Sequence, residues 1–128
     1  MRPVRISVCI MNQTSLRVMS LDEVRQMKDG RVVVITGAGG GIGRKIVDRF
    51  LANGDRVIGL DRAKSSLEEL AASRNAGDQL STSCVDITDK SAVDAFAKRV
   101  GQTYGHVDVL VNCAGFFPVV PFEQISSR

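Results

Sequence analysis

The fold of this 128-residue chain is decided by residues 32–43, which read Val32-Val33-Val34-Ile35-Thr36-Gly37-Ala38-Gly39-Gly40-Gly41-Ile42-Gly43. The first four residues are apolar and β-branched, which is typical of a buried strand. Glycines follow, and they allow a sharp turn and a close approach of a ligand because they carry no Cβ atom. A helical apolar pattern comes next, and the N-terminus of a helix attracts anions through its unpaired N–H groups and its dipole. The sequence therefore predicts a strand, a glycine turn and a helix that together hold a phosphate group.

The spacing of the glycines is Thr-Gly-x-x-x-Gly-x-Gly, with Thr36, Gly37, Gly41 and Gly43 in register. It differs from the common dinucleotide fingerprint Gly-x-Gly-x-x-Gly, because the last position counted from Gly37 is Ile42. It is also no P-loop, since no Gly-Lys-Ser/Thr follows. The pattern resembles that of the short-chain dehydrogenase/reductase family. The alternative is a glycine-rich turn without function.

A carboxylate stands at the end of the next expected strand. Asp61 follows the apolar run 56–60, close to the distance of about 20 residues after the glycines that dinucleotide-binding folds show. It can accept hydrogen bonds from both ribose hydroxyls and repels a 2′-phosphate of roughly −1.5 to −2 charges, which favours NAD over NADP. Arg62 keeps NADP open, because a guanidinium can clamp a 2′-phosphate. Alternatively, the two residues only begin a solvated turn.

Acidic and polar residues also follow the third expected strand, at 80–85. The resemblance implies that Asp86 contacts the adenine amino group of the cofactor, and Ile87 beside it is counted in the same site. The alternative is structural, because Thr88 or Asp89 could cap the next helix.

The fourth expected strand runs into Asn112-Cys113-Ala114-Gly115. This resembles the family's Asn-Asn-Ala-Gly motif, with a small, soft cysteine in place of the second Asn. The resemblance implies that Asn112 braces the sheet and that Ala114 and Gly115 leave room for the cofactor. The predicted cofactor site therefore comprises Thr36, Gly37, Gly41, Ile42, Gly43, Asp61, Arg62, Asp86, Ile87, Asn112, Ala114 and Gly115.

Strand and helix patterns alternate along the chain without hairpin signals, which predicts parallel βαβ units. The expected strands are 31–36, 56–60, 80–85 and 107–112, and the expected helices are 41–53, about 65–74 and about 90–101, with a further helix near residue 122. Right-handed crossovers then give a doubly wound α/β sheet. The resemblance implies a Rossmann-type strand order 3-2-1-4, truncated after the fourth strand. That strand would leave an open edge through which the chain could self-associate.

The catalytic residues of the resembling family have no counterpart here. That family transfers a hydride between a nicotinamide and an alcohol or ketone, with a Tyr-x-x-x-Lys pair and an upstream Ser. The only tyrosine of this chain, Tyr104, is followed four positions later by Asp108. We therefore predict the dinucleotide-binding half of an NAD(P)-dependent oxidoreductase, inactive by itself and with an unassigned substrate. The alternatives are a non-catalytic nucleotide-binding or partner-binding half-domain and the product of a truncated gene.

The composition of the chain limits the classes of partner that can be expected. Residues 1–20 contain Arg2, Arg5 and Arg17 and no acid, whereas residues 21–128 contain equal numbers of basic and acidic side chains. The net charge of +3 therefore comes from the N-terminal segment. No basic face that would attract nucleic acid is expected, and one Tyr and no Trp offer few stacking platforms. Three cysteines without a Cys-x-x-Cys pair and a single histidine favour a cytoplasmic protein without a metal site. No apolar run reaches the roughly 18 residues of a membrane span.

Residues 1–26 lie outside the resemblance. We predict a disordered extension there, followed by an incomplete NAD(P)-binding domain at residues 27–128. The arginines and the lack of acids also fit an organellar transit peptide. Met19 and Met27 are alternative translation starts.

Overall fold

The computed structural model describes residues 7–11, 16–19, 30–116 and 121–124. The strands are β1 (Ser7–Met11), β2 (Leu16–Met19), β3 (Val32–Thr36), β4 (Arg56–Asp61), β5 (Leu80–Cys84) and β6 (Val109–Asn112). The helices are α2 (Gly41–Ala52), α3 (Lys64–Arg74) and α4 (Lys90–Tyr104), with short 3-10 turns η1 (Gly77–Gln79) and η2 (Phe122–Gln124). Each strand and long helix that the sequence predicted is present, with ends shifted by a few residues, where boundaries are least determined.

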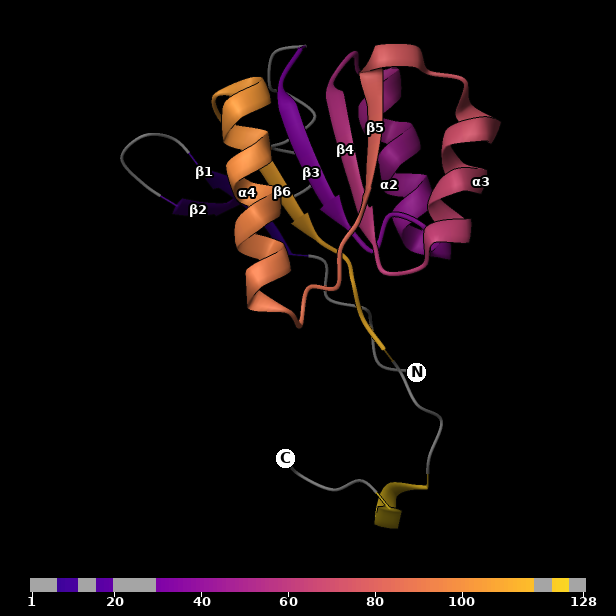
Figure 1. Ribbon diagram of the computed structural model, residues 1–128. Helices are drawn as coiled ribbons and strands as arrows, with labels where there is room; N and C mark the ends of the chain where they lie inside the picture. Colours follow the sequence, from indigo (N-terminus) through magenta and orange to yellow (C-terminus); the bar gives the residue numbers. More distant parts are fainter. Residues whose placement is uncertain (1–6, 12–15, 20–29, 117–120, 125–128) are drawn as a thin grey trace.

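All described strands belong to one sheet with the order β2-β1-β6-β3-β4-β5. The four parallel strands β5-β4-β3-β6 follow the predicted order 3-2-1-4, which is confirmed. In the central register, Val33 lies opposite Val57 on one side and Val109 on the other. α2 and α3 cover one face of the sheet and α4 covers the other, so the fold is a doubly wound α/β sheet (Figure 1).

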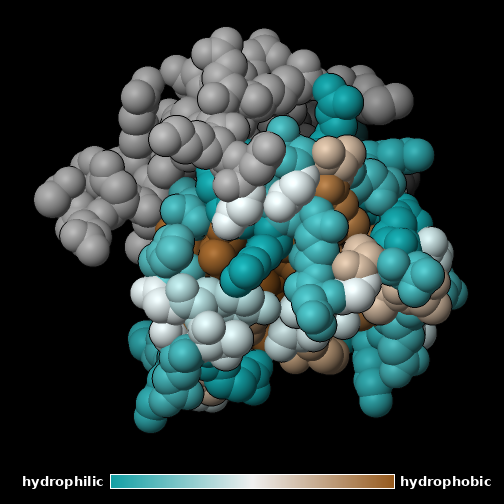
Figure 2. Space-filling model, turned by 90° about the horizontal axis from the view of Figure 1, so that it is seen from above, coloured by the Kyte–Doolittle hydropathy of each residue, from teal (hydrophilic) through white to brown (hydrophobic). Residues whose placement is uncertain are grey.

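The core consists of two apolar layers, one on each side of β3. Val33 and Ile35 face the layer that α2 and α3 cover, whereas Val32 and Val34 face α4. A parallel strand buried on both faces needs such a continuous apolar run, which is why 32–35 contains no polar residue. Viewed from the end where the parallel strands begin, apolar core side chains lie in the middle and hydrophilic ones surround them (Figure 2).

A buried ion pair holds this end of the sheet. Asp55 is fully buried, and its carboxylate oxygens accept hydrogen bonds from Nε and Nη2 of Arg31 at 3.0 and 2.9 Å. The Asn53 amide adds a third donor at 3.1 Å. The pair follows the end of α2, where Gly54 has a φ of +84° in the left-handed region that glycine favours. These residues tie the start of β3 to the α2–β4 turn.

The N-terminal segment departs from the prediction. β1 pairs antiparallel with β6, so that Val8 lies opposite Val111, and β2 pairs antiparallel with β1. The prediction of an open edge on β6 is therefore wrong, and self-association through that edge loses its structural basis. Disorder is also contradicted for 7–11 and 16–19. The physical reason is that the unpaired N–H and C=O groups of β6 offer a template for an apolar extended segment.

The C-terminal segment begins as expected but is described only in part. The η2 turn lies where a helix was predicted to start near residue 122. Residues 117–120 lie outside the described residues. The domain boundary between residues 26 and 27 stays a prediction. Within the part of the chain that the structure describes, no helix is long and apolar enough to cross a membrane.

Candidate functional site

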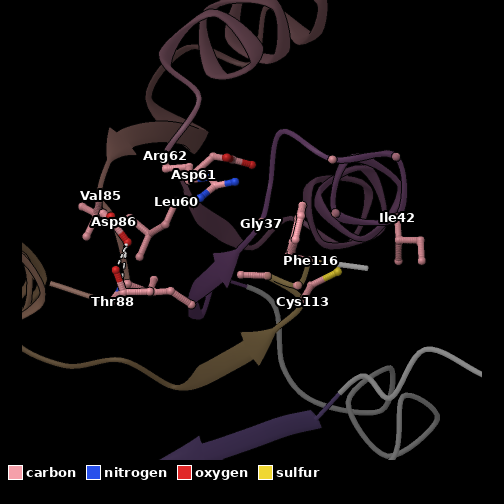
Figure 3. Close-up of a pocket in the computed structure, with 16 residues that line it drawn as sticks. Gly37, Ile42, Leu60, Asp61, Arg62, Val85, Asp86, Thr88, Cys113 and Phe116 are labelled. Atoms are coloured by element: carbon pink, nitrogen blue, oxygen red, sulfur yellow. Dashed lines mark hydrogen bonds between the residues drawn. The ribbon is translucent and has the colours of Figure 1, made fainter. Parts of the chain in front are cut away.

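A cleft with a volume of about 520 Å³ opens at the carboxyl ends of β3, β4, β5 and β6 (Figure 3). This volume lies within the range of about 300–1,000 Å³ that is usual for ligand pockets. All of the predicted site residues except Thr36 and Asn112 line it. Sequence motifs far apart in the chain therefore meet in one place, as the topology of parallel strands requires.

The cleft has further walls that the sequence analysis did not assign to the site. They are Gly40, Leu60, Val85, Thr88, Cys113 and Phe116. Leu60 and Val85 directly precede the predicted acids Asp61 and Asp86. That position in the sequence could have indicated that these two residues also line the site. Phe116 is 76% exposed, and with Ile42 and Ile87 it makes up the exposed large apolar side chains of the described residues. All three line the cleft, which therefore offers exposed apolar surface to a ligand.

The glycine turn is shaped by contacts that only glycine permits. Gly37 has a φ of +68°, and a Cβ there would lie 2.8 Å from the backbone N of Ala114. A Cβ on Gly43 would lie 2.0 Å from the Gly37 carbonyl oxygen. Gly41 differs, because a Cβ there would meet no atom within 4 Å. The fold thus requires glycine at positions 37 and 43. At position 41 the space is free of protein atoms and is open to a ligand in the cleft.

The first turn of α2 faces this space without a protein partner for its dipole. Gly40 at the N-cap provides no side-chain hydrogen bond, and the first turn holds no acidic residue. The N–H groups there and the partial positive charge of the helix end remain available to an anion.

Asp61 connects the end of β4 to the glycine turn. One of its carboxylate oxygens accepts the N–H of Gly39 at 3.0 Å, and the other accepts the N–H of Ala63 at 3.1 Å. The carboxylate is directed towards the glycine turn (Figure 3). Its neighbour Arg62 is exposed and also lines the cleft. The predicted pair therefore lies at the site, with an oriented carboxylate beside an exposed guanidinium side chain.

Asp86 lies across the cleft from the α2 end (Figure 3). Its Oδ1 accepts hydrogen bonds from the hydroxyl of Thr88 at 2.7 Å and from the Thr88 N–H at 2.9 Å. These bonds, the hydroxyl first, and the nearby charge of Arg62 hold the pKa of Asp86 below its usual value of 3.8. Asp89 caps α4 by accepting N–H bonds from Ser91 and Ala92, as the structural alternative proposed. Capping therefore belongs to Asp89, while Asp86 remains anionic at neutral pH and lines the cleft.

Thr36 and Asn112 lie behind the cleft rather than in it. The Thr36 hydroxyl is buried and accepts the N–H groups of Cys113 and Ala114, both at 3.1 Å. Asn112 is exposed, and its side chain makes no hydrogen bond with any described residue. The joint between β3 and β6 that was expected from Asn112 is made in the described structure by Thr36.

Cys84 and Cys113 differ in environment. Cys113 is half-buried in the cleft wall, and desolvation raises the pKa of its thiol above the ordinary value of 9.0. Cys84 is exposed at the end of β5, which is the last strand of the sheet.

The tyrosine and the histidine, which are further candidates for acid–base catalysis, lie at the opposite end of the sheet. The Tyr104 hydroxyl contacts Ser81 at 3.2 Å, and His106 pairs with Asp108, whose carboxylate accepts the Val32 N–H at the start of β3. Among the described residues, no group of three His, Cys, Asp or Glu side chains is arranged to hold a metal ion.

Comparisons with known proteins agree with this geometry. The family model of short chain dehydrogenases matches residues 31–128. Meso-2,3-butanediol dehydrogenase of Serratia marcescens is 40% identical over 87 residues, which make up 68% of this chain and 34% of that protein. A short-chain dehydrogenase of Streptomyces avermitilis has a crystal structure that matches with a TM-score of 0.67 and 39% identity, over 76% of this chain and 35% of that one.

A second solved structure contains a dinucleotide. It is a 3-ketoacyl-(acyl-carrier-protein) reductase of Brucella melitensis in complex with NADH, with a TM-score of 0.58 and 35% identity over 64% of this chain and 33% of that one. The chain spans between 17% and 38% of the length of the curated relatives it matches.

Proposed function

The chain belongs to the short-chain dehydrogenase/reductase family, and we propose from this membership and the cleft that it binds a nicotinamide dinucleotide, NAD in preference to NADP. The observation that carries the proposal is the placement of an oriented carboxylate, Asp61, 3.0 Å from the glycine turn on the wall of one cleft. A phosphate-binding turn and a ribose acceptor side by side are the two features that an adenosine dinucleotide needs. The NADH complex of the Brucella reductase supports the same ligand class.

The pyrophosphate would lie at the first turn of α2. The missing side-chain cap and the open space at Gly41 leave room for phosphate oxygens to reach the N–H groups of the helix end. No side chain of the described glycine turn would have to move, because the turn shape is already maintained by Gly37 and Gly43.

The ribose would lie against Asp61. Both carboxylate oxygens accept one backbone N–H each, and each retains a second lone pair for a ribose hydroxyl. A 2′-phosphate would meet this negative charge at close range, which is the physical basis for preferring NAD. Arg62 would weaken that preference, since its exposed guanidinium can turn towards a phosphate.

The adenine would lie between the ends of β4 and β5. Leu60 and Val85 provide buried apolar surface, and Asp86 provides an acceptor for the exocyclic amino group. Because the Thr88 hydrogen bonds lower the pKa of Asp86, the acceptor stays ionised throughout the neutral range. Ile87, which is half exposed at the mouth of the cleft, would cover the adenine edge.

The wider role proposed is that of an oxidoreductase. A nicotinamide dinucleotide supplies the hydride acceptor or donor, and the residues described here bind and orient it. Tyr104 lies at the end of the sheet remote from the cleft and is not proposed as a catalytic acid or base. We expect the 128-residue chain to bind the dinucleotide without oxidising an alcohol. Binding without turnover also fits the second candidate, a non-catalytic nucleotide-binding module, which the position of Tyr104 favours. We place the protein in the cytoplasm, which the free thiols of Cys84 and Cys113 support.

The test is a calorimetric titration of the full chain with NAD and with NADP. Asp61→Ala should weaken NAD binding by roughly tenfold, as loss of charged hydrogen bonds implies, and should weaken NADP binding less. Asp78→Ala is the matched control, because Asp78 is an exposed acid in η1 that does not line the cleft. An NAD-to-NADP affinity ratio that Asp61→Ala leaves unchanged would remove Asp61 from the ribose site. A wild-type chain that binds neither dinucleotide would refute the proposed function.

A further inference from the structure

Gly39 is held through both of the peptide units that flank its Cα atom. Its N–H donates to Oδ2 of Asp61 at 3.0 Å, and its carbonyl oxygen accepts the Nε–H of Arg44 at 2.9 Å. A Cβ on Gly39 would lie 2.7 Å from Cβ of Ser66, so the peptide is also pressed closely against α3. Gly39 therefore joins the glycine turn to two different elements, β4 and α3.

Arg44 is itself anchored at a distance from the cleft. Its Nη2 donates to the backbone oxygen of Ser66 at 3.3 Å and to Oε2 of Glu69 at 3.0 Å. The arginine side chain is 27% exposed, whereas Glu69 is 72% exposed. Arg44 does not line the cleft, so its guanidinium is committed to the space between the turn and α3. Three donor contacts on two segments give it a fixed direction.

This arrangement sets the direction of the Asp61 carboxylate. Glycine peptides rotate easily, because no Cβ restricts them. The carbonyl oxygen and the N–H of Gly39 belong to successive peptide units that meet at its Cα atom. If the carbonyl lost its partner, φ and ψ of Gly39 would be less restrained, and the N–H could turn away from Asp61. The carboxylate would then keep only the Ala63 N–H on its other oxygen and would lose its fixed orientation.

We propose that Arg44 is a positioning residue, which fixes the Gly39 peptide and through it the ribose-binding carboxylate of Asp61. Its effect on a dinucleotide rests on the proposed function, but its effect on the turn does not. Arg44 touches no part of the cleft, so its contribution to affinity is carried entirely by the geometry of Gly39 and Asp61.

The experiment compares Arg44→Met with Arg49→Met in the full chain. Both changes remove one positive charge from α2, but Arg49 is exposed and its side chain makes no hydrogen bond or ion pair with the described residues. Arg44→Met should raise the Kd for NADH by roughly tenfold, the expected scale for a lost charge-assisted hydrogen bond, and Arg49→Met should leave it within about twofold. Glu69→Gln should also change it little, because Arg44 keeps its bonds to Gly39 and Ser66.

A second readout separates positioning from general destabilisation. In the Asp61→Ala background, Arg44→Met should no longer weaken NADH binding, because two residues that act through one another are not additive. Additive effects of the two changes would overturn the proposal. If Arg44→Met fails to fold, Arg44→Lys keeps the charge but not the fork of donors, and it should show the same loss of additivity.

The third readout needs no dinucleotide. Amide hydrogen exchange at Gly39 should be faster in Arg44→Met than in Arg49→Met, since the exchanging N–H is the one that Asp61 accepts. Equal exchange in both variants would overturn the proposal even if NADH binds. If the wild-type chain does not bind NADH, the proposed function fails, while this exchange comparison still decides the role of Arg44.

Discussion

The hydroxyl oxygen of Thr36 lies 3.1 Å from the backbone nitrogen of Ala114 and accepts its N–H, although 78 residues separate the two in the chain. The same oxygen accepts the Cys113 N–H at the same distance. Thr36 ends β3, and the two donors follow β6, so one buried hydroxyl joins the two strands at the floor of the cleft. This joint also brings Ala114 against Gly37, where the space allows no Cβ.

Thr36→Val tests this joint. Valine has nearly the same shape but no acceptor, so two partly buried N–H groups lose their partner, and we expect a loss of roughly 1–3 kcal/mol in the free energy of unfolding. Urea denaturation measures it. Thr36→Ser keeps the hydroxyl and should lose much less. Equal stability of the valine and serine variants would contradict the role of the hydroxyl.

A comparison of Gly41→Ala with Gly43→Ala distinguishes a glycine that leaves space for a ligand from a glycine that the fold requires. At Gly43 the new Cβ would overlap the Gly37 carbonyl, so the melting temperature should fall and dinucleotide binding with it. At Gly41 the Cβ meets no protein atom, and alanine favours the helix by roughly 0.5–1 kcal/mol over glycine. We therefore expect Gly41→Ala to keep or raise the melting temperature and to lose NADH affinity. Full affinity in this variant would show that no ligand passes Gly41.

Asp55→Ala probes the ion pair at the far end of the sheet. The change removes the carboxylate that Nε and Nη2 of the almost fully buried Arg31 contact, and breaking such a buried pair costs about 3–5 kcal/mol. We expect this loss in chemical denaturation, with NADH affinity unchanged under conditions where the variant is folded. A variant as stable as the wild type would mean that the pair contributes nothing.

The reactivity of the Cys113 thiol can report whether a ligand occupies the cleft. Burial raises the pKa of its thiol, so the reactive thiolate is scarce at neutral pH and grows only as the pH rises beyond 9.0. Iodoacetamide should therefore label exposed Cys84 faster than Cys113 at neutral pH, and NAD should slow the labelling of Cys113 alone. Peptide mass spectrometry reads both sites in one sample. Protection of both cysteines, or of neither, would contradict a ligand in this cleft.

The parallel part of the fold and most of the cleft could be predicted from the sequence. The run 32–35 is apolar at every position, and Asp61, Asp86 and Ala114 all follow strands, so the order of strands brings them to one edge. Local patterns and the handedness of crossovers predict the doubly wound sheet, and the resemblance to the family implied the order of its strands.

The rest depended on contacts between distant segments. β1 pairs with β6 because an edge was free, and nothing in the pattern of 7–11 alone shows that pairing. The resemblance implied that Asn112 braces the sheet, whereas in the described structure the hydroxyl of Thr36 joins β3 to the residues after β6. The bond between Arg44 and Gly39 lies within the motif itself, but only the structure shows the side chain turning towards α3.

The most direct test of the central claim, that this cleft binds a nicotinamide dinucleotide, is a titration of the ¹⁵N-labelled chain with NAD followed by amide chemical shifts. The account predicts saturable shifts at Gly41, Gly43, Asp61, Asp86 and Gly115, and none at Tyr104 or His106 at the opposite end of the sheet. Shifts confined to the opposite end, or an unchanged spectrum at saturating NAD, would contradict it.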